Sequence, residues 1–174
     1  MSETETKASP FWRFSLAFYR QQNVADACIA LQEQSGVDVN LLLFLLWHAA
    51  RRRAFTATQV AVLEQRIGAW REMTVVPLRA VRRALKLPPA LVEPGTAEAL
   101  RTRIKAVELE AERLQQEAMY ELASAAPLGM ESPSSAEAAR VNVAAYETMG
   151  AVPFPKPAVE TLLAAFAKLD PKGE

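Results

Sequence analysis

The run Leu41–Trp47, with the sequence LLLFLLW, constrains the fold of this chain more than any other feature. On a helix, a segment that is apolar at every position presents apolar side chains in all directions and must be covered on most sides. Even when extended to Ala50, the run is much shorter than the roughly 20 residues that span a bilayer, and charged residues follow it directly. It therefore predicts a buried helix at the centre of a helical protein.

The flanks of the run predict where this central helix begins and ends. Asp38 is a residue type that caps helix N-termini, because its carboxylate accepts a hydrogen bond from a free backbone N–H group. Arg51–Arg53 would lie favourably at the negative end of the helix dipole. We therefore expect a central helix over about 39–53.

Capping residues and prolines mark further helices on both sides of the central one. Their expected starting points are Ser9–Pro10, Asn23, Thr56 or Thr58, Thr74–Pro77 and Thr96. With the central helix counted as the third, the fifth helix follows Thr74–Pro77 and ends before Pro88, and the sixth runs over about 96–124. No segment has the pattern of a β-strand. The predicted fold is all-α, a single bundle of six to eight helices around the central apolar helix.

The long helix carries a heptad-like apolar seam, in which residues recur at spacings of four and three. The seam comprises Leu100, Ile104, Val107, Ala111, Leu114 and Ala118. We expect this seam to belong to a long helix within the bundle. The same seam over 100–118 could instead pair with its counterpart in a second copy, so a homo-oligomer is possible.

The composition divides the chain into three parts. Residues 1–9 are polar and acidic and predict a disordered N-terminus, while residues 10–124 hold the helical core domain. Residues 125–174 begin with a Pro-, Gly- and Ser-rich linker and continue with two short helices. The sequence leaves open whether this tail docks on the core or forms a semi-independent arm.

The chain lacks the usual signatures of secretion and of cofactor chemistry. It has equal numbers of acidic and basic residues, and Cys28 is its one cysteine, so an intrachain disulfide is impossible. One histidine, His48, and one cysteine do not make a zinc site, and no glycine-rich phosphate loop is present. We therefore expect a cytoplasmic protein with no metal, no cofactor, no membrane insertion and no catalytic residues.

Charge is unevenly distributed along the chain. Residues 51–105 hold 12 basic and 4 acidic side chains, a net charge of +8, and residues 106–174 have a net charge of −6. Arg79, Arg82, Arg83 and Lys86 follow the i, i+3, i+4, i+7 spacing of one helix face. Pairing with the acidic part of the long helix is the simplest interpretation of this basic stripe. An acidic protein partner is the next, and nucleic acid is disfavoured because exposed aromatic side chains are missing nearby.

Polar residues within the apolar helices suggest a different site. Asn40 lies one turn inside the central helix, and a buried amide requires hydrogen-bond partners. A hydrogen bond to Asp38 would satisfy it, or it could form the floor of a pocket. The candidate pocket residues are Trp12, Tyr19, Gln32, Asp38, Asn40 and His48.

Three stretches carry a resemblance to a known family: FWRFSLAFY at 11–19, the segment 24–32, and GVDVNLLLF at 36–44. With the segment from Trp70 to Lys86, they resemble a family of short proteobacterial helical proteins of unknown function, over roughly residues 11–113. The resemblance implies a bacterial cytoplasmic protein. It directs attention to Trp12, Tyr19, Gln32, Asp38, Asn40, Trp47, Arg79 and Arg83.

These observations lead to three functional hypotheses. The first is a non-enzymatic interaction module that presents Arg79, Arg82, Arg83 and Lys86 to an acidic protein partner. The alternative is a small-molecule-binding or enzymatic bundle with a polar pocket near Tyr19, Gln32, Asp38, Asn40 and His48. The third is binding of nucleic acid or phosphate through the basic stripe.

Overall fold

The computed structural model describes residues 8–169, so most of the N-terminal segment expected to be disordered lies outside it. In this range the chain forms eight α-helices, one π-helical turn and two very short strands, which confirms the all-α prediction. The elements are α1 (Pro10–Tyr19), α2 (Val24–Ser35), α3 (Val39–Ala49), β1 (Arg53–Ala54), α4 (Ala57–Trp70), η1 (Arg71–Val75), α5 (Val76–Ala84), α6 (Pro94–Ala125), β2 (Met130–Glu131), α7 (Ser135–Met149) and α8 (Lys156–Leu169). None of the helices in this range is both long and apolar enough to cross a membrane.

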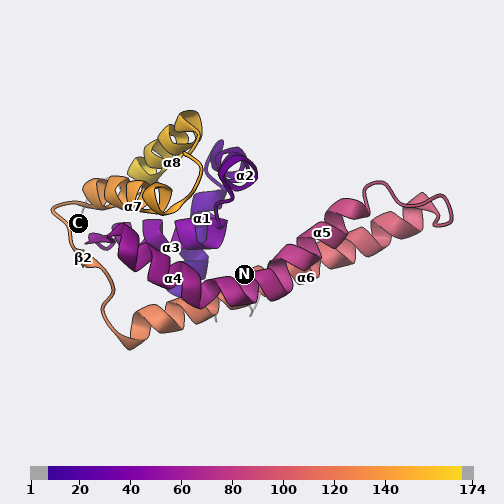
Figure 1. The fold of residues 1–174 in the computed structure, drawn as a ribbon, viewed down its shortest axis with the longest axis horizontal. Coiled ribbons are helices and arrows are strands. Elements are labelled where there is room, and N and C mark those ends of the chain that lie inside the picture. Colours follow the sequence, from indigo (N-terminus) through magenta and orange to yellow (C-terminus); the bar gives the residue numbers. More distant parts are fainter. Residues whose placement is uncertain (1–7, 170–174) are drawn as a thin grey trace.

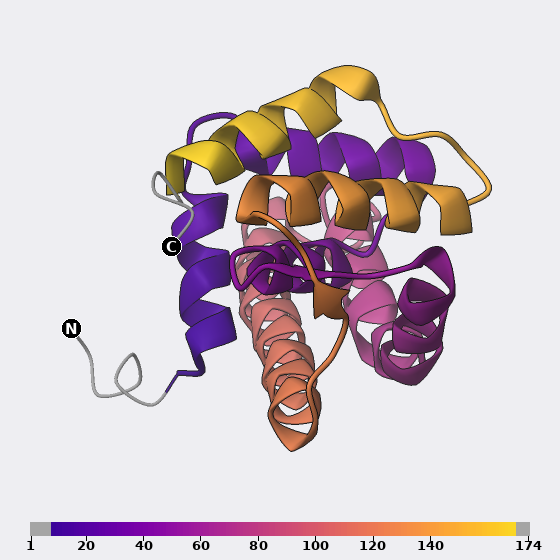
Figure 2. The ribbon, with the colours of Figure 1, turned by 90° about the vertical axis from the view of Figure 1, so that its left-hand side faces the viewer.

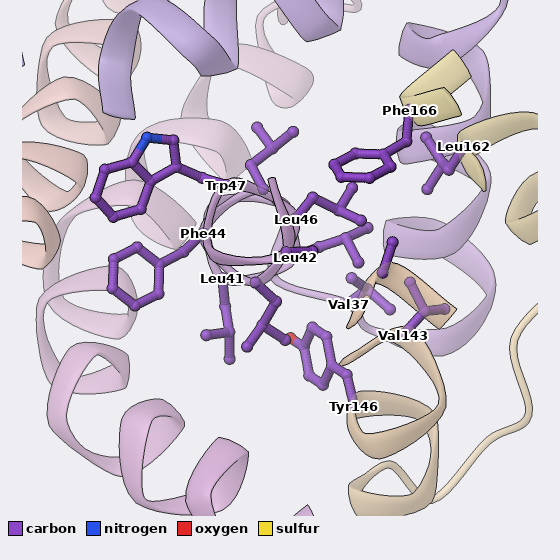
Figure 3. Packing of buried hydrophobic residues seen from close by; sticks show 14 of the residues in the cluster. Val37, Leu41, Leu42, Phe44, Leu46, Trp47, Val143, Tyr146, Leu162 and Phe166 are labelled. Atoms are coloured by element: carbon purple, nitrogen blue, oxygen red, sulfur yellow. The ribbon is translucent and has the colours of Figure 1, made fainter. Parts of the chain in front are cut away.

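The apolar run forms α3, and α3 is the centre of the fold. Every residue of the helix from Asn40 to Ala49 is buried, as its composition requires. Figure 3 looks along this helix and shows Leu41, Leu42, Phe44 and Trp47 pointing to different sides of it. Asp38 caps its N-terminus by accepting a hydrogen bond from the backbone N–H of Asn40.

The C-terminal helices are docked on the core. Val143 and Tyr146 of α7, and Leu162 and Phe166 of α8, belong to the same buried apolar cluster as α3. Figure 2 shows α7 and α8 as a layer beside α2 and above the central helix. Burial of these apolar side chains is the main force that holds the layer on the core.

Asn142 connects this layer to the end of α3. Its side chain is fully buried and accepts a hydrogen bond from the N–H of Phe55 at 2.7 Å. Its amide group donates to the carbonyls of Leu45 at 2.8 Å and Arg53 at 3.0 Å. One side chain therefore bonds to one backbone group of α3 and to two of the segment that follows it.

The central helix is shorter than the expected span of about 39–53. It ends at Ala49, and Arg52 has a left-handed conformation with φ of 56°. Arg53 instead begins β1, which pairs with β2 in a two-residue antiparallel ladder that the sequence pattern did not indicate. The guanidinium of Arg53 donates to the carbonyls of Leu128 and Gly129, so long-range hydrogen bonds compensate for the lost helical turn.

The expected break between the fourth and fifth helices is also absent. The turn η1 joins α4 to α5, with an N–H of Val76 bonded to the carbonyl of Arg71, and the three elements run on as one long helical segment. Pro77 lacks an N–H group and would clash inside a regular helix, and the wider π-helical turn accommodates it. This segment and α6 form a helical hairpin that projects from the body of the protein (Figure 1).

Candidate functional site

A cleft of about 880 Å³ lies where the projecting hairpin leaves the body. One side is formed by α1, α2 and the first turn of α3, and the other by η1, α5 and α6. This volume is within the range typical of small-molecule sites.

Nine of the ten candidate residues from the sequence line this one cleft. They are Trp12, Tyr19, Gln32, Asp38, Asn40, Arg79, Arg82, Arg83 and Lys86. The sequence suggested a pocket and a basic stripe as separate features, and the hairpin brings them together. His48 does not line the cleft.

The innermost part of the cleft is an ionic network around Asp38. Its carboxylate is almost fully buried and accepts hydrogen bonds from Arg71 Nη1 at 2.8 Å and Gln115 Nε2 at 3.0 Å. Arg71 also pairs with Glu64 and with the exposed Glu72. Burial opposes the charge on Arg71, but the hydrogen bonds to Glu64 and Asp38 outweigh it and raise its pKa. This network fixes the N-terminus of α3 against α4, η1 and α6.

A chain of amides continues from this network toward α1. Asn40 donates to Gln115 Oε1 at 2.8 Å and accepts from Gln116 Nε2 at 2.7 Å. Two polar atoms of the cleft lining have no partner among the described residues, namely Gln116 Oε1 and Ser15 Oγ. Their residues are only 2% and 3% exposed. Buried polar atoms without partners are unusual and mark a place where a ligand or water can bond.

Two arginines of the basic stripe form ion pairs with α6, and this is the simplest of the interpretations that the sequence allowed. Arg79 contacts Glu108 at 3.0 Å and Glu112 at 2.8 Å, and Arg82 also contacts Glu108. Burial alone would raise the pKa of Glu108, but hydrogen bonds from Arg82 and Arg79 lower it. Burial is the main cause of the raised pKa of Glu112.

The outer rim of the cleft is positively charged. Arg83 is exposed and makes one surface ion pair with Glu33 of α2 at 3.1 Å. Lys86 of α5 and Lys105 of α6 also line the rim, and neither has an ion pair within residues 8–169. An anion at this rim would therefore meet two free ammonium groups.

Apolar side chains cover the walls between the rim and the amides. They include Leu16, Tyr19, Ile29, Val76 and Leu109. Ile29, Val76 and Leu109 are exposed although they are large and apolar. Partial burial is the main cause of the raised pKa of Tyr19, so its phenol group is neutral at physiological pH and can donate a hydrogen bond.

His48 lies about two helical turns, or about 12 Å, from Asn40 along α3. Its ring is surrounded by Phe44, Trp47 and Phe55 at centroid distances of 4.5, 4.9 and 5.1 Å. Neither ring nitrogen has a hydrogen-bond partner within the described part of the chain. His48 is therefore a core residue and not part of the cleft.

Because the imidazole of His48 is buried, we expect the stability of the protein to depend on pH. Burial, followed by repulsion from Arg51 and Arg53, lowers the His48 pKa from 6.5 to about 3. As the pH falls, His48 takes up a proton in the unfolded chain before it does so in the folded protein. Its contribution to the free energy of unfolding is therefore fully present above pH 6.5 and declines as the pH falls toward 3. Between pH 5.5 and 4.5, where His48 is charged in the unfolded chain and neutral in the folded one, we expect a decline of about 1 kcal/mol per pH unit from this residue in urea unfolding.

A His48→Leu variant separates this effect from the titration of carboxylates. The variant keeps an apolar side chain in the core and has no imidazole to protonate. Its stability should fall less steeply than that of the wild type over the same pH interval. Equal slopes for the two proteins would contradict a neutral buried histidine.

Metal and thiol chemistry have no support in the described residues. Within residues 8–169, no group of His, Cys, Asp and Glu side chains is placed to hold a metal ion. Cys28 is fully buried in α2, and burial raises its thiol pKa to about 12. Its thiol is therefore protonated and packs as an apolar group.

Sequence reasoning did not assign Gln115, Gln116 or Glu108 to a site. A signal for Glu108 and Gln115 was present in the spacing of α6. Ala97, Ile104, Glu108, Ala111, Gln115 and Met119 share the inward face of that helix. Polar residues on an inward face require partners, which identifies Glu108 and Gln115 as part of a buried network.

A model of a protein family described as proteins of unknown function (DUF2390) matches residues 10–119, more than half of the chain. The chain belongs to the DUF2390 family. The match runs from α1 through most of α6, so it includes every element that borders the cleft and excludes α7 and α8. No curated protein and no solved structure matches the chain. For this DUF2390 protein, the cleft geometry is therefore the basis for a functional assignment.

Proposed function

We propose that the cleft binds a small amphipathic organic anion. The observation that supports this most strongly is the joint presence, on one cleft lining, of a cationic rim, apolar walls and two buried polar atoms without partners. Such a ligand would place its acid group near Lys86 and Lys105, and its apolar part against Ile29 and Val76. A hydrogen-bonding group could reach Gln116 and Ser15.

The interaction-module hypothesis receives less support from the same contacts. Arg79 and Arg82 are already neutralised by Glu108 and Glu112, so an acidic protein surface would find only Arg83 and Lys86 of the basic stripe exposed. The same limit applies to a nucleic-acid backbone, which requires many phosphate contacts. A small anion needs only one or two free cations and fits the geometry better. We place this binding function in the cytoplasm, as the sequence suggested.

The proposal is tested with 1-anilinonaphthalene-8-sulfonate, a fluorescent amphipathic anion. The folded protein should bind it saturably at one equivalent, with a fluorescence increase and a response of Trp12. A Lys86→Glu, Lys105→Glu variant should bind at least tenfold more weakly, because both free rim cations become anions. Ile29→Trp should also weaken binding by narrowing the cleft without changing its charge.

Lys156→Glu is the matched control, since Lys156 is exposed on α8 and does not line the cleft. It should bind like the wild type. Circular dichroism must show that all variants are folded, because this probe also binds partly unfolded chains. Binding that is unchanged in the folded rim variant, or weakened equally by Lys156→Glu, would overturn the proposal.

A further inference from the structure

The heptad-like seam of α6 divides into an inner and an outer part. Ala111 is buried and Ile104 is half-buried on the side of the helix that packs in the hairpin. Leu100, Val107 and Leu114 are 39%, 51% and 44% exposed. With the exposed Ala118, these three residues form what we call the outer stripe. Leu100, Val107 and Leu114 recur every seven residues, and Ala118 follows one helical turn after Leu114. The helix drifts by only about 20° per heptad, so these residues stay on one face.

The outer stripe is separate from the proposed ligand site. None of its four residues lines the cleft, which contacts α6 through residues such as Glu108, Glu112 and Gln116. From Leu100 to Leu114 the stripe extends over about 21 Å of helix. Three large apolar side chains exposed in one line on a projecting hairpin are typical of a surface that another chain covers.

The charges beside the stripe indicate which chain covers it. Arg103 directly precedes Ile104 of the seam, and Glu110 directly precedes Ala111, so both residues flank the seam. Both are exposed. Arg103 has no ion pair within residues 8–169. Glu110 pairs only with Arg113 of its own helix, at 2.7 Å. The stripe therefore has a basic side chain on one side of Val107 and an acidic one on the other.

We propose that α6 pairs with α6 of a second copy in an antiparallel arrangement, about a twofold axis at Val107. In this register Leu100 lies opposite Leu114 of the second copy, and Val107 lies opposite its own counterpart. Arg103 lies opposite Glu110 of the second copy, and the twofold axis produces this ion pair twice. A parallel arrangement would carry Arg103 and Glu110 of the two copies to opposite flanks of the interface, so this ion pair could not form. Arg103 and Glu110 therefore meet only in the antiparallel direction.

Sedimentation velocity on the full chain, over a series of concentrations from about 1 to 100 μM, tests this interface. The wild type should shift from monomer to dimer as concentration rises, and Val107→Glu should remain a monomer. Val62→Glu is the matched control, because Val62 is equally exposed at 52% but lies on α4. It should dimerise like the wild type.

Charge exchange tests the antiparallel register. Arg103→Glu and Glu110→Arg should each weaken the dimer at least tenfold, because each places like charges opposite one another. The double variant Arg103→Glu, Glu110→Arg should recover the wild-type dissociation constant, because it restores both ion pairs in the opposite sense. A wild type that stays monomeric throughout, or a double variant no better than the single ones, would overturn the proposal. Ligand binding in the cleft does not depend on either outcome.

Discussion

Replacing Asn142 with alanine is expected to lower the free energy of unfolding by about 3–5 kcal/mol. The change leaves the N–H of Phe55 and the carbonyls of Leu45 and Arg53 without their side-chain partner, in a site that water does not reach. Each unsatisfied buried backbone group costs about 1–3 kcal/mol, and the removed amide leaves a small cavity. Chemical denaturation followed by far-UV circular dichroism measures this loss.

Val141→Ala is the control for this experiment, since Val141 precedes Asn142 in α7 and is 39% exposed. It should cost less than about 1 kcal/mol. A similar loss for both variants would contradict the structural role of Asn142. Because Asn142 connects α7 to the segment after α3, its replacement should also increase hydrogen exchange of the Phe55 amide more than that of α6.

The second large effect is expected at Asp38. Asp38→Ala removes the cap of α3, the buried partner of Arg71 and the acceptor for Gln115. Removal of one partner from a buried ion pair typically costs about 3–5 kcal/mol. Arg71 keeps Glu64 and part of its contact with water, so we expect about 3 kcal/mol. Asp38→Asn keeps the cap and should cost about half as much.

Glu72 offers a matched control, because it pairs with the same arginine. Its side chain is 64% exposed, compared with 5% for Asp38. Exposed ion pairs contribute about 0–1 kcal/mol, so Glu72→Ala should have little effect on denaturant unfolding. If the two alanine variants were equally destabilised, burial of the Asp38 carboxylate would not be the cause.

Most of the fold class could be predicted from local patterns. The run Leu41–Trp47 cannot be solvated on any side, so its composition alone places it at the centre of the core. Asp38 caps α3 as expected, because capping depends on residues within one turn. The end of α3 could not be predicted in the same way. It depends on the left-handed turn at Arg52 and on the pairing of β1 with β2, which lies far along the chain.

The candidate site shows the same division. The spacing of Arg79, Arg82, Arg83 and Lys86 places them on one face of α5, and the sequence contains that information. Which of them stay free depends on α6, since Glu108 engages only the first two. The position of α5 against α6 follows from the π-helical turn, which keeps α4 and α5 continuous past Pro77. No local pattern around Pro77 distinguished that turn from a break.

The sequence by itself determined that the chain is helical, that α3 is its core and which polar and charged residues share a helix face. Periodicity is sufficient for these conclusions, because each concerns one helix and its exposure to water. Only the tertiary structure decided which faces meet. It joined the pocket residues of α1–α3 to the basic stripe of α5 in one cleft and moved His48 out of it. The physical reason is that the meeting of helix faces depends on their register and crossing, which long-range packing and hydrogen bonds determine.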